Sequence, residues 1–105
     1  MNIKKELLKS IDNSKVICAE IIIGSEYDDE RVFIRLRLNY SATEFDNFLK
    51  TLDCEYNDGY GEQKLYGVVW LDSNKWLERG EYDGSEWWEK REIPAIPATL
   101  AYLIQ

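Results

Sequence analysis

The apolar side chains near the start of the chain recur at helical spacing: they are Ile3, Leu7, Leu8 and Ile11. This spacing predicts a short amphipathic helix over residues 3–12, with a lysine-rich polar face. The segments "KVICAEIII" (15–23) and "RVFIRLRL" (31–38) are instead rich in β-branched residues, and the second alternates strictly. Such segments are typical of strands, so we expect a hairpin. The acidic segment "SEYDDE" between them is expected to be an exposed loop.

The segment "YSATEF" carries the clearest helix-start signal of the chain. Ser41 is suited to cap a helix, and Glu44, three residues later, completes a capping box. Tyr40 is placed to pack on Phe45 as a hydrophobic staple. The helix that we expect to follow runs from residue 42 to about 52. Its apolar stripe has the i, i+3, i+4, i+7 spacing of a helix that packs on a core: Phe45, Phe48, Leu49 and Leu52.

The second half of the chain predicts three further strands, "LYGVVWL", "KWLERGEY" and "EWWEKRE", joined by short turns. In the first turn, "DSN", Asn74 takes the left-handed conformation that asparagine tolerates, which pairs Trp70 with Trp76. After Glu92, the segment "IPAIP" is incompatible with an interior strand, because proline lacks the amide donor. Pro97 is suited to begin a last short helix.

The turn at residues 83–84, "DG", admits two registers. If these two residues form the whole turn, like-charged glutamates face each other: Glu81 with Glu86, and Glu78 with Glu89. If the turn has three residues, 82–84, the pairs become Arg79 with Trp87, Glu78 with Trp88, and Trp76 with Lys90. The second register avoids both repulsions and offers cation–π contacts worth about 0.5–1 kcal/mol at an exposed site. We therefore predict the three-residue turn.

That register divides the tryptophans between the two faces of the sheet. The expected tryptophan face carries Tyr66, Val68, Trp70, Trp76, Glu78, Trp88 and Lys90. The expected opposite face carries Leu65, Val69, Leu71, Leu77, Arg79 and Trp87. The aliphatic face matches the stripe of the second helix in size. The tryptophan face either fills a core beneath the first helix and the C-terminal segment, as large aromatics usually do, or stays open for binding.

Together these elements predict one α+β domain over residues 1–105. Its order is α-β-β-α-β-β-β, with an antiparallel sheet of about five strands and helices mainly on one face. The composition is 45% apolar and 13% aromatic, which supplies enough side-chain area for a sizeable core.

Charge and cysteine content narrow the classes of partner. Twenty acidic and thirteen basic residues give a net charge of −7, which repels nucleic acid and anionic membranes and attracts basic surfaces. No run approaches the roughly 20 apolar residues of a membrane span. Cys18 and Cys54 lack the close spacing of a metal clamp, and isolated thiols fit a reducing cytoplasm. We therefore expect a cytoplasmic protein that binds neither nucleic acid nor membrane.

We expect no enzymatic activity, cofactor or metal. The chain has no histidine, and its serines lie in turn or cap positions without a recognisable base. The acidic segment "DCEYNDGYGEQK" at 53–64 departs from a calcium-binding EF-hand loop. Asp58 stands where that loop needs glycine, and Lys64 where it needs glutamate.

Three motifs, "GVVW", "WLERGEYDGSEWW" and "IPAIP", resemble a family of short uncharacterised proteins of phage and bacterial genomes. The resemblance covers residues 65–97, about a third of the chain. Asn74 stands where this family more often has glycine, in keeping with a left-handed turn position. The resemblance implies a phage or bacterial setting and supplies no catalytic residues.

The remaining candidate for function is the tryptophan face with its acidic surroundings. We interpret three tryptophans as anchors for a protein partner: Trp70, Trp76 and Trp88. We interpret four acids as the charge that steers a basic partner: Glu78, Glu81, Asp83 and Glu86. The function expected is inhibition, by occlusion of a basic surface on a host, defence or toxin protein. The alternatives are a small-molecule binding domain or minor enzyme that uses Glu78, Glu81 and Glu86, and a homodimer closed by the aromatic face.

Overall fold

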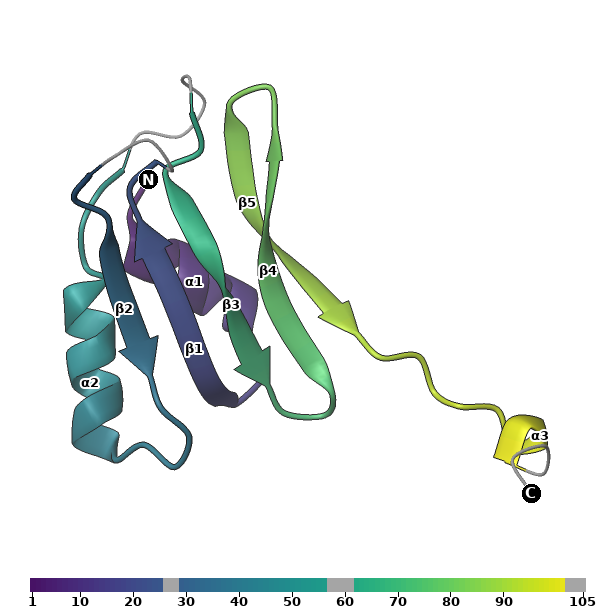
Figure 1. The fold of residues 1–105 in the computed structure, drawn as a ribbon. Coiled ribbons are helices and arrows are strands. Elements are labelled where there is room, and N and C mark those ends of the chain that lie inside the picture. The colour runs from purple at the N-terminus through teal and green to yellow at the C-terminus, as the bar shows by residue number, and fades with distance from the viewer. Residues whose placement is uncertain (26–28, 57–61, 102–105) are drawn as a thin grey trace.

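The computed structural model describes the chain except residues 26–28, 57–61 and 102–105 (Figure 1). The helices are α1 (Ile3–Ile11), α2 (Ala42–Thr51) and α3 (Ala98–Ala101). The strands are β1 (Val16–Ile23), β2 (Val32–Leu36), β3 (Leu65–Leu71), β4 (Lys75–Tyr82) and β5 (Ser85–Glu92). The α+β class and the predicted order of the elements are confirmed, with α3 following the last strand.

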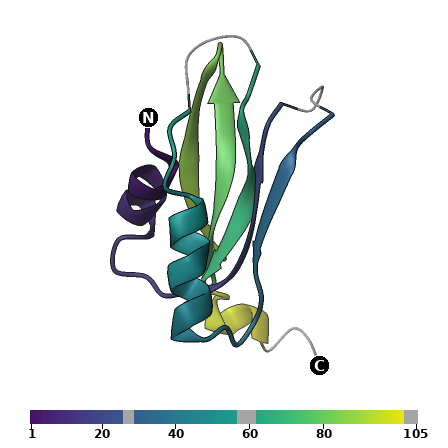
Figure 2. The same cartoon turned by 90° about the vertical axis from the view of Figure 1, so that its left-hand side faces the viewer.

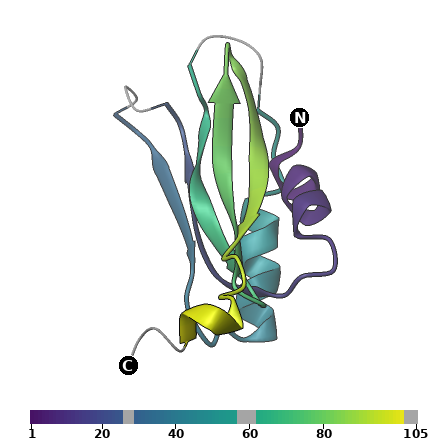
Figure 3. The same cartoon turned by 90° about the vertical axis from the view of Figure 1, so that its right-hand side faces the viewer.

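The strands form one sheet in the order β2-β1-β3-β4-β5, and every neighbouring pair is antiparallel. Helices α1 and α2 lie on the same face of this sheet, as the two side views show (Figures 2 and 3). The prediction that the helices lie mainly on one face is therefore confirmed. The opposite face, which we call the open face, is not covered by any helix in the described part of the chain.

The core lies between these two helices and the sheet. Helix α1 buries Ile3, Leu7 and Ile11, which leaves Leu8 of the expected apolar stripe largely exposed. From α2, Phe48 is buried, while Phe45 and Leu49 pack against the core from its edge. The sheet contributes fully buried side chains from its central strands: Ile21, Leu65, Val69 and Leu77. The aliphatic face predicted from the sequence is thus the face that packs on the helices.

The start of α2 has the predicted capping box. The Ser41 hydroxyl accepts a hydrogen bond from the Glu44 amide at 3.1 Å, and the Glu44 carboxylate accepts one from the Ser41 amide at 3.3 Å. Tyr40 stacks on Phe45 with 5.4 Å between ring centroids, as expected of a hydrophobic staple. Arg37 adds two hydrogen bonds to the Glu44 carboxylate, each of 2.8 Å.

These contacts predict a specific acid sensitivity. The hydrogen bonds from Arg37 and the Ser41 amide lower the pKa of Glu44 to about 2. A carboxyl with a lowered folded-state pKa contributes stability above its unfolded pKa, and this contribution is lost as the pH falls through the folded value. We expect wild type to lose more stability than Glu44→Gln between pH 5 and pH 2, the range spanned by pKa values of about 4.3 unfolded and about 2 folded.

The measurement is the urea midpoint of unfolding across this pH range. Asp46→Asn changes a carboxylate of the same helix outside the capping box and serves as the control. It should keep the wild-type pH dependence. Equal pH dependence in wild type and Glu44→Gln would show that the capping box does not store this free energy.

Of the two predictions for the turns that join β3, β4 and β5, one is confirmed and one is wrong. Between β3 and β4, Trp70 pairs with Trp76 and Asn74 has φ of 59°, as predicted, and Ser73 shares that left-handed conformation. Between β4 and β5 the predicted three-residue turn is wrong. Only Asp83 and Gly84 form the turn, with φ of 51° and 86°, as favoured in a tight hairpin. The pairs are therefore Glu81 with Glu86, and Glu78 with Glu89.

Arginines remove the repulsion that argued against this register. Glu86 forms an ion pair with Arg79 at 2.7 Å, so it does not confront Glu81 as a free charge. Arg91 forms ion pairs with both Glu78 and Glu89. Each like-charge pair across the hairpin thus includes a carboxylate that a neighbouring guanidinium neutralises.

Gly80 makes room for a tryptophan ring. It lies opposite Trp87, and a Cβ added to Gly80 would lie 2.7 Å from the Trp87 indole. The ring therefore lies across the strand at the one position where no side chain stands in its way. Trp87 is consequently on the open face and Trp88 on the helix-covered face, the reverse of the predicted assignment.

After β5 the chain leaves the sheet as an arm, which we define as residues 93–101 (Figure 1). The arm ends in α3, which follows Pro97 as expected. It makes the protein elongated, with a radius of gyration of 16.2 Å, against about 13 Å for a compact domain of this length. Within the described residues, no helix combines the length and apolar character needed to cross a membrane.

Candidate functional site

The open face carries its side chains in three rows that cross the strands. The first row is aromatic at its centre and contains Cys18, Trp70, Trp76 and Arg91. The second row is charged and contains Arg35, Glu20, Val68, Glu78 and Glu89. The third row contains Phe33, Ile22 and Tyr66, with Trp87 lying over Gly80 farther along the sheet. Two apolar rows therefore flank a charged one.

A groove hollows the open face at its first row. Its volume is about 670 Å³, and its lining is mainly apolar. Trp70 of β3 and Trp76 of β4 line the groove together with Ile17 of β1 and Leu38, which follows β2. Ile93, the first residue of the arm, completes the lining. Trp70 remains 46% exposed, so a large aromatic surface is left in contact with solvent.

The acids of the second row are already paired with arginines of the same face. Glu20 accepts a hydrogen bond from Arg35 at 2.6 Å, and Arg91 joins Glu78 and Glu89. All five side chains are substantially exposed, so each pair contributes at most about 1 kcal/mol to stability. Such pairs are easily exchanged for pairs with the cations of another molecule.

The third row adds a second exposed aromatic surface. Trp87 is 39% exposed although its ring lies over Gly80. Phe33 projects from the edge strand β2, with the Arg35 guanidinium 5.3 Å from its ring centroid. Arg31 lies over the Tyr66 ring at 4.9 Å. Tryptophan, tyrosine and arginine are the residue types most enriched at protein-binding hot spots.

The structure brings together three of the seven predicted site residues. Trp70, Trp76 and Glu78 lie on the open face as predicted. The assignment of Trp88 and Glu86 to an exposed site is wrong, since they face α1 and are 8% and 4% exposed. A shift of one residue between predicted and observed register turns each side chain of a strand to the other face. This shift exchanged Trp88 for Trp87, which the sequence reasoning missed.

The other two predicted acids lie at the tip of the β4–β5 hairpin. Asp83 is in the turn itself, and Glu81 accepts a hydrogen bond from the Gly84 amide at 3.1 Å. Both are exposed, but Glu81 belongs to the helix-covered side of β4. The three glutamates of the small-molecule alternative, Glu78, Glu81 and Glu86, therefore do not share the tryptophan face.

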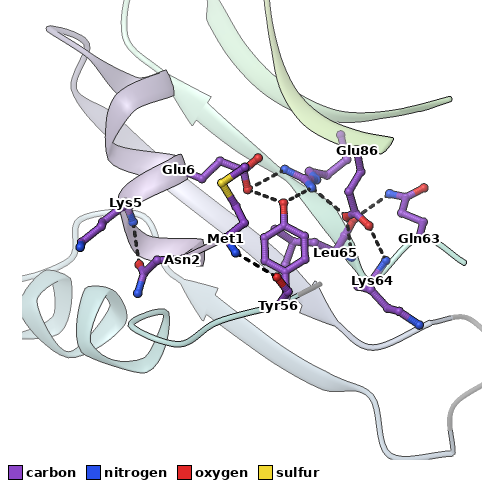
Figure 4. Close-up of polar contacts among 10 residues, drawn as sticks. Met1, Asn2, Lys5, Glu6, Tyr56, Gln63, Lys64, Leu65 and Glu86 are labelled. Carbon is purple, nitrogen blue, oxygen red and sulfur yellow. Dashed lines mark hydrogen bonds and ion pairs between the residues drawn. The ribbon is translucent and has the colours of Figure 1, made fainter. Parts of the chain in front are cut away.

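Glu86 instead belongs to a buried polar network beneath the sheet (Figure 4). Its carboxylate accepts hydrogen bonds from the Lys64 and Leu65 amides at 2.8 and 3.0 Å and forms the 2.7 Å ion pair with Arg79. Arg79 also lies 3.3 Å from Glu6 of α1, and its guanidinium covers the Trp88 ring at 4.9 Å. One arginine thus links the first helix to both strands of the hairpin.

Tyr56 closes this network. Its hydroxyl donates to Glu6 at 2.7 Å and accepts from Arg79 at 3.1 Å. Burial and the bond to Glu6 raise the pKa of Tyr56 well above its ordinary value. Burial acts to lower the pKa of Arg79, but its bonds to Glu86 and Tyr56 outweigh that effect and raise it. The raised pKa values keep the Tyr56 hydroxyl neutral and the Arg79 guanidinium charged, as suits a structural clamp.

Comparisons with known proteins found no matching family model, no matching curated protein and no matching solved structure. Among the described residues, no group of three or more histidine, cysteine or acidic side chains is placed to hold a metal ion. Cys18 and Cys54 are both free thiols. The expected calcium mismatch at Asp58 lies outside the described residues. Function is therefore inferred from the open face.

Proposed function

We propose that this protein is a non-enzymatic binding module that holds a protein partner against the open face of its sheet. The observation that supports this is the exposure of aromatic side chains along the first and third rows of that face, above all Trp70 and Trp87. Large exposed apolar patches on a small domain mark interaction sites. Tryptophan at the centre of such a patch contributes more binding free energy than most residue types.

The charge of the molecule supports a partner with a basic surface. The net charge of −7 attracts a basic protein over a distance, although the charges of the open face are largely balanced. On contact, the arginines paired with Glu20, Glu78 and Glu89 give way to cations of the partner. Charge then mainly accelerates association and selects the partner, while the aromatic rows hold it.

A broad, shallow face suits occlusion of a surface on the partner. We propose that the module acts in this way as an inhibitor, in the cytoplasm, on a host, defence or toxin protein. The resemblance of "WLERGEYDGSEWW" to phage and bacterial proteins supports that setting.

Capture of partners from bacterial lysate, with matched variants, tests this proposal. Trp70→Thr and Trp87→Thr each remove one exposed indole and keep a β-branched residue that suits a strand. Leu8→Ala removes a leucine side chain that is 40% exposed on α1, on the helix-covered side of the sheet, and is the control. We expect wild type and Leu8→Ala to capture the same protein and both tryptophan variants to lose it. Equal recovery by all four proteins would contradict a binding role for the open face.

A further inference from the structure

The arm is an apolar segment that packs on nothing in the described structure beyond its first residue. Its side chains Ile93, Ile96 and Leu100 are all exposed. The sequence from Ile93 onward, "IPAIPATLAYLIQ", contains no charged residue, although 31% of the whole chain is charged. Exposed apolar side chains without interspersed charge are unusual on a soluble surface and indicate a segment that docks on a protein.

The same chain carries a groove of matching character. The groove is lined mainly by apolar side chains, and Lys75 is the one residue of the lining with a formal charge. The arm begins at the rim of this groove, because the Ile93 amide donates a hydrogen bond to the Asn74 carbonyl at 3.1 Å and its side chain lines the groove. The arm then runs away from the sheet (Figure 1).

The prolines make it unfavourable for the arm to turn back into its own groove. Pro94 and Pro97 each fix their own φ and hold the preceding residue, Ile93 or Ile96, in an extended conformation. A return to the groove would need a sharp reversal directly after Ile93, where the backbone is most restricted. The occupant that fits the groove is therefore the arm of a second copy.

The charge of the groove and the arm, and the number of residues in them, are compatible with contact between two copies of the chain. Two molecules of net charge −7 repel each other, but the arm is uncharged and the groove contributes only Lys75, so this contact brings no acidic side chains of the two copies together. The groove lining and the arm together supply about 19 residues on each copy, close to the lower end of the roughly 20–30 residues found on each side of a stable interface.

We propose that two copies form a symmetric dimer by exchanging arms, with Ile96 and Leu100 of each copy inserted into the other's groove. A twofold arrangement makes both contacts identical and closes the assembly at two copies. This dimer does not rest on the proposed function. It adds regulation to that function, because the inserted arm covers Trp70 and Trp76 and so competes with any partner that uses the first row.

Sedimentation of the purified full chain at micromolar concentration, with no other protein present, tests the dimer. Wild type is expected at twice the chain mass of 12.4 kDa. A chain that ends at Glu92 is expected to sediment as a monomer. A wild-type monomer at every concentration, or a truncated chain that still dimerises, would overturn the proposal and leave the binding role of the open face untouched.

Point variants separate insertion of the arm from other contacts. Ile96→Asp in the arm and Leu38→Asp in the groove should each give monomers. Tyr82→Asp should remain dimeric, since Tyr82 is as exposed as Ile96, 77% against 74%, but lies in neither surface. A mixture of the two monomeric variants restores one intact contact and should yield dimers again at high concentration. A mixture that stays monomeric there would contradict insertion of the arm into the groove.

Discussion

Replacing Glu86 by alanine is expected to lower the free energy of unfolding by about 3–5 kcal/mol, the typical loss when one partner of a buried ion pair is removed. The Glu86 and Arg79 side chains are only 1% and 2% exposed. The change leaves the Lys64 and Leu65 amides without their acceptor and removes one of the carboxylates that neutralise Arg79. Urea-induced unfolding of wild type and variant measures the difference.

Glu81→Ala is the matched control, because Glu81 lies directly opposite Glu86 in the hairpin and is exposed. It should change stability by no more than about 0.5 kcal/mol. The double variant Arg79→Met with Glu86→Leu should recover only part of the loss, because it removes the unpaired guanidinium but still leaves the Lys64 and Leu65 amides without their acceptor. A Glu86→Ala protein as stable as Glu81→Ala would show that the buried network does not hold the hairpin to α1.

Gly67→Ala is expected to destabilise the protein by about 2–6 kcal/mol, from roughly 1–3 kcal/mol of backbone strain and 1–3 kcal/mol of overpacking. Gly67 has φ of 137°, which other residues rarely adopt. A Cβ at this position would lie 2.2 Å from the Glu20 carbonyl oxygen and 2.9 Å from the Ile21 Cα. These are backbone atoms of the adjacent central strand, so relief requires β1 and β3 to separate.

Gly80→Ala is the control for this prediction. Its added Cβ would meet only the Trp87 side chain, and that ring lies at the surface and is able to shift. We expect a loss of about 1–3 kcal/mol, the usual range for overpacking without backbone strain. Thermal or urea unfolding compares the two variants. Equal losses of stability in the two variants would contradict the prediction, because they would show that β1 and β3 separate as easily as the exposed Trp87 ring shifts.

Features set by neighbouring residues were predictable from the sequence. The capping box needs only Ser41 and Glu44 at their fixed spacing, and the staple needs Tyr40 and Phe45. The left-handed turn at Asn74 likewise follows from one residue type, and it fixed the pairing of Trp70 with Trp76. The Trp70–Trp76 pair of the open face was therefore predicted from the sequence alone.

The β4–β5 part of the open face was not predicted, because its register depends on more residues than those directly opposite each other in the hairpin. Repulsion between Glu81 and Glu86 argued against the two-residue turn, yet the preference of Asp83-Gly84 for that turn prevailed. Arg79 lies two positions before Glu81 in β4, and it neutralises Glu86 of β5 on the same face of the sheet. A rule that compares only residues directly opposite each other omits this neighbour and so assigns Trp87 to the wrong face.

The buried network and the groove were beyond sequence reasoning for another reason. Glu6 and Tyr56 meet across 50 residues of chain, and neither belongs to a motif that predicts the other. The groove likewise combines Ile17, Leu38 and Ile93, which come from the two ends and the middle of the chain. Only the order of the strands in the sheet brings such residues together.

The affinity of the captured partner for purified variants tests the binding role of the open face most directly. Trp70→Thr and Trp87→Thr should each raise the dissociation constant by about 30-fold or more, since a hot-spot tryptophan contributes at least about 2 kcal/mol to binding. Leu8→Ala, which changes an exposed side chain on α1 across the sheet from the open face, should bind like wild type. Equal dissociation constants for wild type and both tryptophan variants would contradict the proposal that this face holds the partner.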